Sequence, residues 1–479
     1  MAQKISSKKI AKNVILSVVV QAISLAISFI LNFIVPKFID ENQYSYWQTF
    51  ALYMNYVGIL HFGILDGIVL RYSQYDYDEL DKSKLRSQFQ LILVFNTILT
   101  LIISIFSCSF LDGEYKLVWV LVAISIVTKN IFSYTSYSYQ ITNRIKKYAF
   151  AVIIQNTVFA VGVVILLLLK VNHFYWYCIA NLLGDVVAVL VGMNINKELY
   201  FGEKIPVKDA LKESKMNISA GIVLMVATIS SSLLIGGAKM IVNWRWDNLT
   251  FGKVAYSFSA TTLFLAFVKA ISIVLFPSLK RMDTEQLPTL YGNIRKIISP
   301  LFFVALAFYF PLCKVLQLWL PKYEQSLYYM GILLPIIIFS SKVSLLTDNY
   351  LKAYRKEKTM FLINVIAVIL GFTMFLICAY VLNNLDLLLY CVVFIVSFRS
   401  ILSEIVIMKI IGKSFTKEFI IESILTIAFI LITVNVKGLI KGFIIYAGIL
   451  CVYLIEEFYK VIIKFIKRKD NGKKENEKQ

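Results

Sequence analysis

Acidic side chains are scarce in this sequence, as are the residues that build metal and redox sites. There are 29 Asp and Glu against 49 Lys and Arg, a formal net charge of +20, and only two histidines, His61 and His173. The six cysteines lie in or beside apolar runs, without the spacing of a metal or redox site, and are interpreted as small hydrophobic residues. We therefore expect no metal site, no disulfide and no cofactor.

Motifs of nucleotide-driven chemistry are also missing. The sequence has no GxxxxGK[ST] phosphate-binding loop, no GxGxxG turn after a strand and no HExxH. These absences argue against an ATP-driven pump within the chain. No catalytic residue is predicted, and no nucleic acid is expected as a partner.

Apolar residues dominate what is present. They make up 59% of the 479 residues, the mean hydropathy is +0.73, and only 16% of residues are charged. A soluble core cannot hide so much apolar surface, so the chain is predicted to be an all-α, multi-pass membrane protein. Fourteen runs are long enough to span a bilayer: 13–35, 46–70, 87–110, 117–139, 149–169, 174–193, 216–240, 252–276, 297–318, 325–347, 360–381, 386–408, 418–435 and 440–463.

The distribution of bases predicts the orientation. An even number of spans places both termini on one side, and the basic N-terminal segment leads into a first span without a cleavage site. With the termini in the cytoplasm, about 33 of the 49 bases lie in inner segments, about 9 in outer loops and about 7 within spans. Both termini are therefore predicted to be cytoplasmic, and the tail 466–479 to be disordered.

Two similar sequence segments indicate an internal duplication. Lys129 to Lys147 and Lys342 to Lys358 each begin with a lysine inside an apolar segment and end in a basic turn. They fall on spans four and ten, so the halves should be parallel six-helix bundles, related by an axis along the membrane normal and separated by a cavity. The predicted units are an N-terminal lobe (1–195), a cytoplasmic interlobe linker (196–215), a C-terminal lobe (216–410), two additional helices (411–465) and the tail (466–479).

Ionisable residues inside spans are the candidate functional groups, because they are costly in a bilayer unless they face water or a partner. The bases Lys129, Lys269, Lys342 and Arg399 are predicted to line a cationic cavity that attracts an anion. Helical spacing from Lys129 adds a hydroxyl, aromatic and amide stripe suited to sugars, formed by Ser133, Tyr137 and Gln140.

The acidic residues and the bases both allow a second interpretation. Asp66, Asp185 and Glu404 could couple transport to a proton or sodium ion, or could serve helix packing. The lysines could form salt bridges with acids on other spans, and the Ser and Thr residues could hold helices together. The sequence alone leaves both interpretations open.

The second span carries a resemblance to a known family. The run NQYSYWQTFALYMNYVGILHFGILDGIVLRYSQY, from Asn42, resembles a pattern of O-antigen-type polysaccharide flippases of the multidrug/oligosaccharidyl-lipid/polysaccharide exporter superfamily. The resemblance covers roughly residues 1–410. The matching residues are Tyr44, Trp47, Phe62, Gly63, Gly67, Arg71 and Tyr72.

This resemblance implies a V-shaped pair of lobes in the bacterial cytoplasmic membrane. It implies a non-enzymatic, monomeric transporter that flips an undecaprenyl-diphosphate-linked oligosaccharide to the outer leaflet by alternating access, for surface polysaccharide biosynthesis. The expected partners are this lipid-linked anionic oligosaccharide and membrane lipids, with the glycan polymerase and chain-length machinery as candidates.

Three alternatives remain at this point. A cation-coupled drug or metabolite exporter of the same superfamily would require buried acidic residues, and span one contains none. A membrane-embedded polysaccharide polymerase would need larger outer loops than this chain offers. A scaffold that transports nothing would leave the repeat-related lysines unexplained.

Overall fold

The described part of the chain is helical. The computed structural model describes residues 22–142, 144–280 and 285–456, and within these ranges it contains helices and no strand. Nine of the helices in these ranges are long and apolar enough to cross a bilayer, and three bent pairs reach that length together. The segment Ala22–Phe38 is a shorter apolar helix, and Asn248–Lys280 has 33 residues. A helix lies at the described part of each predicted span, which confirms the all-α membrane architecture.

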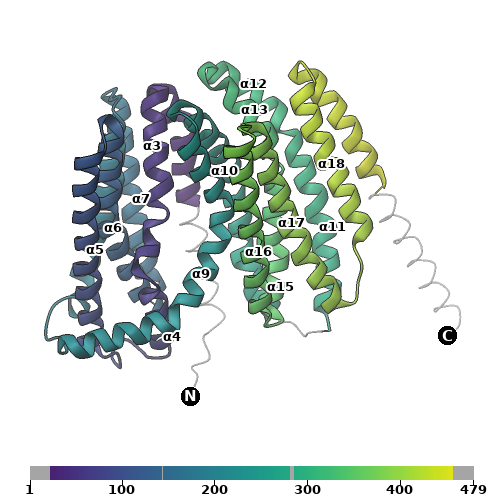
Figure 1. The fold of residues 1–479 in the computed structure, drawn as a ribbon. Coiled ribbons are helices and arrows are strands. Elements are labelled where there is room, and N and C mark those ends of the chain that lie inside the picture. Colours follow the sequence, from purple (N-terminus) through teal and green to yellow (C-terminus); the bar gives the residue numbers. More distant parts are fainter. Residues whose placement is uncertain (1–21, 143, 281–284, 457–479) are drawn as a thin grey trace, which may run out of the picture.

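The first half of the chain forms one of two groups of helices that stand side by side (Figure 1). Antiparallel neighbours pack directly, α5 against α6 and α7 against α8. The elements are η1 Ile30–Ile34, α2 Val35–Phe38, α3 Glu41–Met54, η2 Val57–His61, α4 Ile64–Tyr72, α5 Lys82–Phe110, α6 Gly113–Ile141, α7 Ile145–Leu168, α8 Phe174–Ile195 and η3 Lys197–Leu199.

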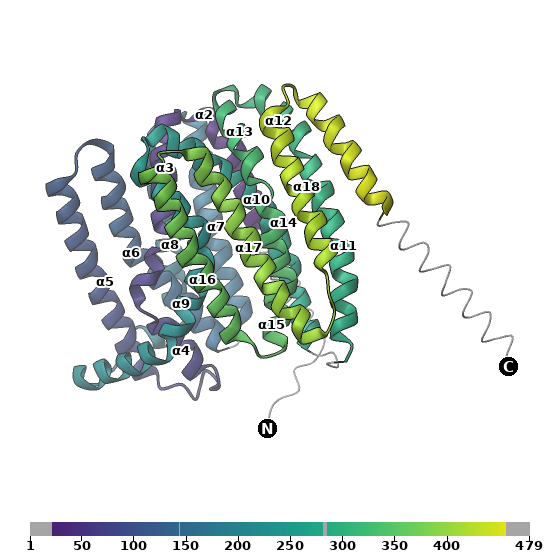
Figure 2. The ribbon, with the colours of Figure 1, turned by 45° about the vertical axis from the view of Figure 1, so that its right-hand side comes forward.

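The second half forms the other group, at the edge of which α18 and a last helix stand (Figures 1 and 2). Its elements are α9 Val207–Arg245, α10 Asn248–Lys280, α11 Leu287–Ala307, α12 Tyr309–Trp319, η4 Pro321–Tyr323, α13 Glu324–Leu333, α14 Ile336–Lys342, η5 Val343–Thr347, α15 Asp348–Ala353, α16 Glu357–Leu376, η6 Ile377–Val381, α17 Leu385–Ile411, α18 Thr416–Asn435 and the unlabelled helix Leu439–Glu456.

We call the end of the molecule at which α4, the start of α9 and the turn after α15 lie the basic end; it is the lower end in Figure 1. Several Arg and Lys residues of the predicted inner loops gather there. The opposite end carries the turns between α5 and α6 and between α16 and α17. By the charge distribution, the basic end is the one predicted to face the cytoplasm.

The second span is broken near its middle. Phe62 and Gly63 both have left-handed backbone conformations, with φ of 48° and 80°. Consecutive left-handed residues cannot continue a right-handed helix, so α3 and α4 meet at 55°. Unlike glycine, phenylalanine adopts a left-handed backbone conformation only at an energetic cost. The surrounding packing therefore holds the break in place.

Helix α9 links the two groups. Its first part lies across the basic end, and after a bend of more than 40° its second part rises between the groups (Figures 1 and 2). Glycines permit a very close crossing with α4: a Cβ atom on Gly67 would lie 1.9 Å from the carbonyl oxygen of Asn217, and one on Gly221 would lie 2.1 Å from that of Gly63. The GxxxG segment Gly63–Gly67 is thus a docking surface for α9.

The second part of α9 contacts both groups. A Cβ on Gly236 would overlap the Tyr56 hydroxyl of the first group, while one on Gly237 would overlap the Phe372 ring of α16 in the second. The Tyr56 hydroxyl also donates a hydrogen bond to the Ser232 carbonyl, at 3.1 Å. Helix α9 is therefore packed against both groups at once, and a change in their relative position would alter its contacts.

Two predicted boundaries differ in detail from the structure. The linker predicted at 196–215 contains η3 and the first turns of α9, which are docked on α4 and α5. Span nine begins at Leu287, ten residues before the prediction, because the polar start of α11 finds partners inside the protein. The predicted tail 466–479 lies outside the described residues, and the division into lobes stays a prediction.

Candidate functional site: charges within the membrane spans

Four charged side chains meet inside the second group of helices. Lys342 of α14 is 1% exposed, and its Nζ lies 2.7 Å from an oxygen of Glu404 and 2.6 Å from one of Glu422. Arg295 of α11 contacts the same two carboxylates, with its Nη2 3.2 Å from Glu422. We call Arg295, Lys342, Glu404 and Glu422 the buried charge cluster. Two bases and two acids make it formally neutral, which is the arrangement that buried ions require.

Further contacts complete this cluster. The Ser299 hydroxyl donates to Glu422 at 2.8 Å, and the Phe419 ring lies 5.3 Å from Lys342 Nζ and 5.4 Å from the Arg295 guanidinium. Glu422 and Phe419 belong to α18, the first of the two additional helices. The Tyr446 hydroxyl of the last helix likewise donates to the Phe303 carbonyl, at 3.0 Å. The two additional helices are therefore anchored to the core by buried polar contacts.

The first group holds a simpler pair at the related position. Lys129 Nζ of α6 lies 3.6 Å from an Asp185 oxygen of α8, which also accepts a hydrogen bond from Gln155 of α7. Asp185 is fully buried, whereas the Lys129 side chain is 28% exposed. This lysine keeps access to its surroundings while its charge is partly compensated.

The two pairs follow the sequence duplication. In each half, the lysine of the fourth span pairs with an acid of the sixth: Lys129 with Asp185, and Lys342 with Glu404. Tyr139 and Tyr350 of the two similar sequence segments are also both buried, at the basic ends of their spans. Ion pairs between spans, the second interpretation offered by the sequence, thus describe both lysines, and Lys342 lies away from any accessible surface.

The other ionisable residues predicted inside spans either have a partner or have side chains outside the described residues. Arg399 Nη2 lies 3.9 Å from Asp348, and His61 Nε2 lies 3.8 Å from Asp66. The Gly63 amide donates to His61 Nδ1 at 3.1 Å, which leaves the ring proton on the nitrogen facing Asp66. Lys269 is in α10, but its side chain is outside the described residues. A role for Asp66, Asp185 and Glu404 in ion coupling stays a prediction.

The polar stripe predicted from Lys129 coincides with the more accessible side of α6. Ser133 and Tyr137 are partly exposed and Gln140 is exposed, whereas most neighbours on the other sides of this half of α6 are buried. Lys129 itself lies at one end of the stripe. The four predicted residues therefore share one accessible face, and contact with cargo remains to be tested.

Sequence reasoning missed two intramembrane bases, Arg295 of the buried charge cluster and Lys239. Lys239 lies in the second part of α9, between Gly236, which packs on Tyr56, and Asn243, which hydrogen-bonds to Tyr53 and Thr49. It is surrounded by protein yet partly accessible, and among the described residues no ion pair or hydrogen bond to it is found. It lies near the end of the predicted span 216–240, and only the packing of α9 between the groups reveals that protein surrounds it.

At the opposite end, the two groups are in direct contact. The Tyr44 ring of α3 packs edge-on against those of Tyr256 and Tyr323, at centroid distances of 6.3 and 5.7 Å. The Trp319 indole donates to the Phe33 carbonyl at 2.8 Å, and Lys37 lies over its ring. The groups are thus held together at this end in the present conformation.

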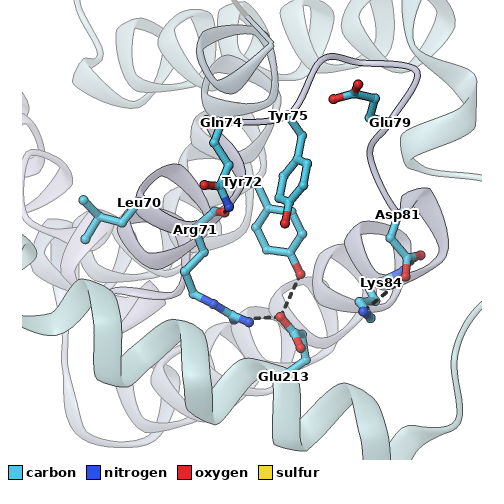
Figure 3. Close-up of a pocket in the computed structure, with 9 residues that line it drawn as sticks. All are labelled: Leu70, Arg71, Tyr72, Gln74, Tyr75, Glu79, Asp81, Lys84 and Glu213. Carbon is cyan, nitrogen blue, oxygen red and sulfur yellow. Dashed lines mark hydrogen bonds and ion pairs between the residues drawn. The ribbon is translucent and has the colours of Figure 1, made fainter. Parts of the chain in front are cut away.

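At the basic end, the Arg-Tyr pair of the second span holds α9. Arg71 Nη1 lies 2.7 Å from Glu213, and the Tyr72 hydroxyl donates to the same oxygen at 2.7 Å (Figure 3). Arg71 also donates to Asn217, whose backbone touches Gly67. The residues from Gly63 to Tyr72 that carry the resemblance therefore form one continuous docking surface for the first part of α9.

Glu213→Gln should loosen that surface. The neutral amide loses the charge-assisted contacts with Arg71 and Tyr72, each of which contributes roughly 1.5–3 kcal/mol when charged. We expect backbone hydrogen exchange in residues 207–220 to accelerate about tenfold or more, with little change in α5 or α6. Glu203→Gln, at an exposed position before α9, is the matched control. Equal protection in both variants would contradict this role of Glu213.

Comparison with known proteins supports the fold. No family model matches the sequence, and no curated protein matches it significantly. Among solved structures, the lipid II flippase MurJ in an inward closed conformation is similar over 95% of this chain and 100% of its own, with a TM-score of 0.66 and 13% identity.

Two further solved structures share the architecture. An inward-facing MATE multidrug resistance transporter of the MOP superfamily has a TM-score of 0.59 and 13% identity, covering 82% of this chain and 98% of its own. A MOP superfamily transporter from Pyrococcus furiosus has a TM-score of 0.51 and 12% identity, covering 84% and 97%. The chain therefore has the fold of the MOP-superfamily transporters.

Proposed function

We propose that this protein is a flippase that moves an undecaprenyl-diphosphate-linked oligosaccharide from the cytoplasmic to the outer leaflet of a bacterial cytoplasmic membrane. It acts by alternating access of its two lobes, as a non-enzymatic step in surface polysaccharide biosynthesis. The fold supports a transporter, and the extensive similarity to a lipid II flippase supports a lipid-linked cargo. The observation that carries the proposal is Lys239, a base between the two groups of helices that has no acidic partner in the described part of the chain.

The electrostatics favour an anionic cargo. Lys129 and Lys342 are balanced by acids, whereas Lys239, which lies between the two groups, has no acidic partner among the described residues, so its charge is available to a ligand. Lys129 contributes more weakly, through its accessible side. Moving a negative charge outward also gains roughly 2.3 kcal/mol per 100 mV in an inside-negative cell, so the membrane potential alone favours export.

A multidrug exporter is the second candidate, because MATE transporters share the fold. Transport of a cation would call for a free acid inside the spans. Four of the intramembrane acids located above are instead paired with bases: Asp185 with Lys129, Asp348 with Arg399, and both glutamates of the buried charge cluster with Lys342 and Arg295. The fifth, Asp66, faces the neutral ring of His61. This pattern favours the anionic cargo.

Lys239→Gln tests the proposal in a cell that depends on this protein for its surface glycan. Loss of one charge-assisted contact of roughly 1.5–3 kcal/mol is expected to slow glycan export by about tenfold or more. Lys129→Gln should have a smaller effect. Export is measured as surface glycan per cell after depletion of the wild-type protein.

The matched control is Lys253→Gln, because the partly exposed Lys253 already donates a hydrogen bond to Gln325, at 3.0 Å. All variants are first compared for their amount in the membrane. Normal export by Lys239→Gln at a normal protein level would refute the assignment of Lys239.

A further inference from the structure

A polar cavity of about 490 Å³ lies at the basic end, where α4, the loop after it, α5 and α9 meet (Figure 3). This volume is within the range of sites for small ligands. Neither the intramembrane charges nor the lobe contacts use it. Its lining residues are Leu70, Arg71, Tyr72, Gln74, Tyr75, Glu79, Asp81, Lys84 and Glu213.

The lining has the composition of a carbohydrate site. The rings of Tyr72 and Tyr75 lie next to each other, with centroids 6.4 Å apart, and Tyr75 is exposed (Figure 3). Aromatic faces carry partial negative charge and attract the polarised C–H groups of a sugar ring. Gln74 offers both a donor and an acceptor, as sugar hydroxyl groups require.

The charges of the cavity disfavour a phosphate ligand. Arg71 is paired with Glu213 at 2.7 Å, and Lys84 with Asp81 at 3.3 Å. Burial raises the pKa of the Asp81 carboxyl, but hydrogen bonds from Ser83 and Lys84 outweigh this and hold it below its ordinary value, so Asp81 is charged at neutral pH. Glu79, which accepts a hydrogen bond from the Asp76 amide at 3.1 Å, leaves the lining with an excess of one negative charge.

We infer that this cavity binds a neutral or amine-bearing saccharide, and that it is where the glycan of the cargo is recognised at the basic end. This inference rests on the proposed function. The diphosphate is repelled here and attracted by Lys239, so the two ends of the headgroup are recognised at separate places. Because Glu213 lines the cavity and also holds α9, a bound saccharide contacts the helix that links the two groups of helices.

Ligand-observed saturation-transfer NMR on the purified full-length protein in detergent tests the inference. The probes are the methyl glycosides of glucose, galactose, N-acetylglucosamine and glucosamine, with inorganic pyrophosphate as the charge control. At least one glycoside should receive saturation, and Tyr75→Ala and Glu79→Gln should each reduce the signal at least fivefold. Tyr354→Ala, at a partly exposed tyrosine in the turn after α15, should leave it unchanged.

Three outcomes would overturn the inference: no glycoside binds, binding survives Tyr75→Ala and Glu79→Gln, or pyrophosphate binds in the cavity. These outcomes are separate from the failure of the proposed function. If Lys239→Gln blocks export while Tyr75→Ala binds sugars and exports glycan normally, only the saccharide site falls. If the protein binds sugars but Lys239→Gln exports normally, the saccharide site is supported and the role assigned to Lys239 is refuted.

Discussion

Replacing Lys342 by methionine is expected to destabilise this protein more than any other single change considered. The substitution leaves Glu404 and Glu422 to share one base, Arg295, in a region that is almost completely buried. Breaking a buried ion pair by removing one partner costs roughly 3–5 kcal/mol. The expected result is a large fall in both the folded amount and the apparent melting temperature of the detergent-solubilised protein, measured by size-exclusion thermostability.

The second substitution Glu404→Gln provides an internal check. It removes the unpaired charge created by Lys342→Met, so the double variant should recover a substantial part of the lost stability. Lys314→Gln, at an exposed position in α12, should have little effect. A Lys342→Met variant as stable as Lys314→Gln would show that the cluster does not carry the stability assigned to it.

Gly67→Ala is expected to produce the second large effect. The added Cβ atom would lie 1.9 Å from the carbonyl oxygen and 2.7 Å from the Cα atom of Asn217, so backbone and not only a side chain must move. Overpacking of this kind costs roughly 1–3 kcal/mol, and here it also separates α4 from α9. We expect lower thermostability together with loss of protection in residues 207–220, measured by hydrogen exchange.

Gly448→Ala is the matched control for this change. Gly448 lies in the last helix with nothing within 4 Å of its added Cβ atom. In an uncrowded helix, alanine is favoured over glycine by roughly 0.5–1 kcal/mol. The same substitution should therefore change stability in opposite directions at the two positions. Equal effects would contradict the close crossing of α4 and α9.

The arrangement of spans could be predicted because it depends on local composition. Apolar runs long enough for a bilayer fix where helices lie, and the structure places a helix at the described part of each one. The duplication could be recognised because Lys129 and Lys342 lie in similar sequence segments. One acidic partner of each, Asp185 and Glu404, was among the predicted residues. The pairing depends on helices that are distant in sequence and could be offered only as one of two interpretations.

Other features had no local signal. Arg295 belongs to a polar segment that hydropathy assigns to a loop, and only its contacts with Glu404 and Glu422 make it an intramembrane residue. Glu422 lies in an additional helix that the duplication does not cover. Lys239 stands out because it has no described partner, and a sequence alone cannot show whether a side chain has one. The Arg-Tyr pair of α4 could be recognised as a pattern, but its partner Glu213 follows only from the docking of α9.

Transport by the purified full-length protein in liposomes tests the central claim most directly. The cargo is a fluorescent polyprenyl-diphosphate-linked oligosaccharide, and its arrival in the opposite leaflet is followed by an impermeant lectin that binds the sugar. We predict protein-dependent transfer that falls about tenfold or more with Lys239→Gln and stays unchanged with Lys253→Gln. Transfer no faster than in protein-free liposomes, or equal transfer by Lys239→Gln, would contradict the account.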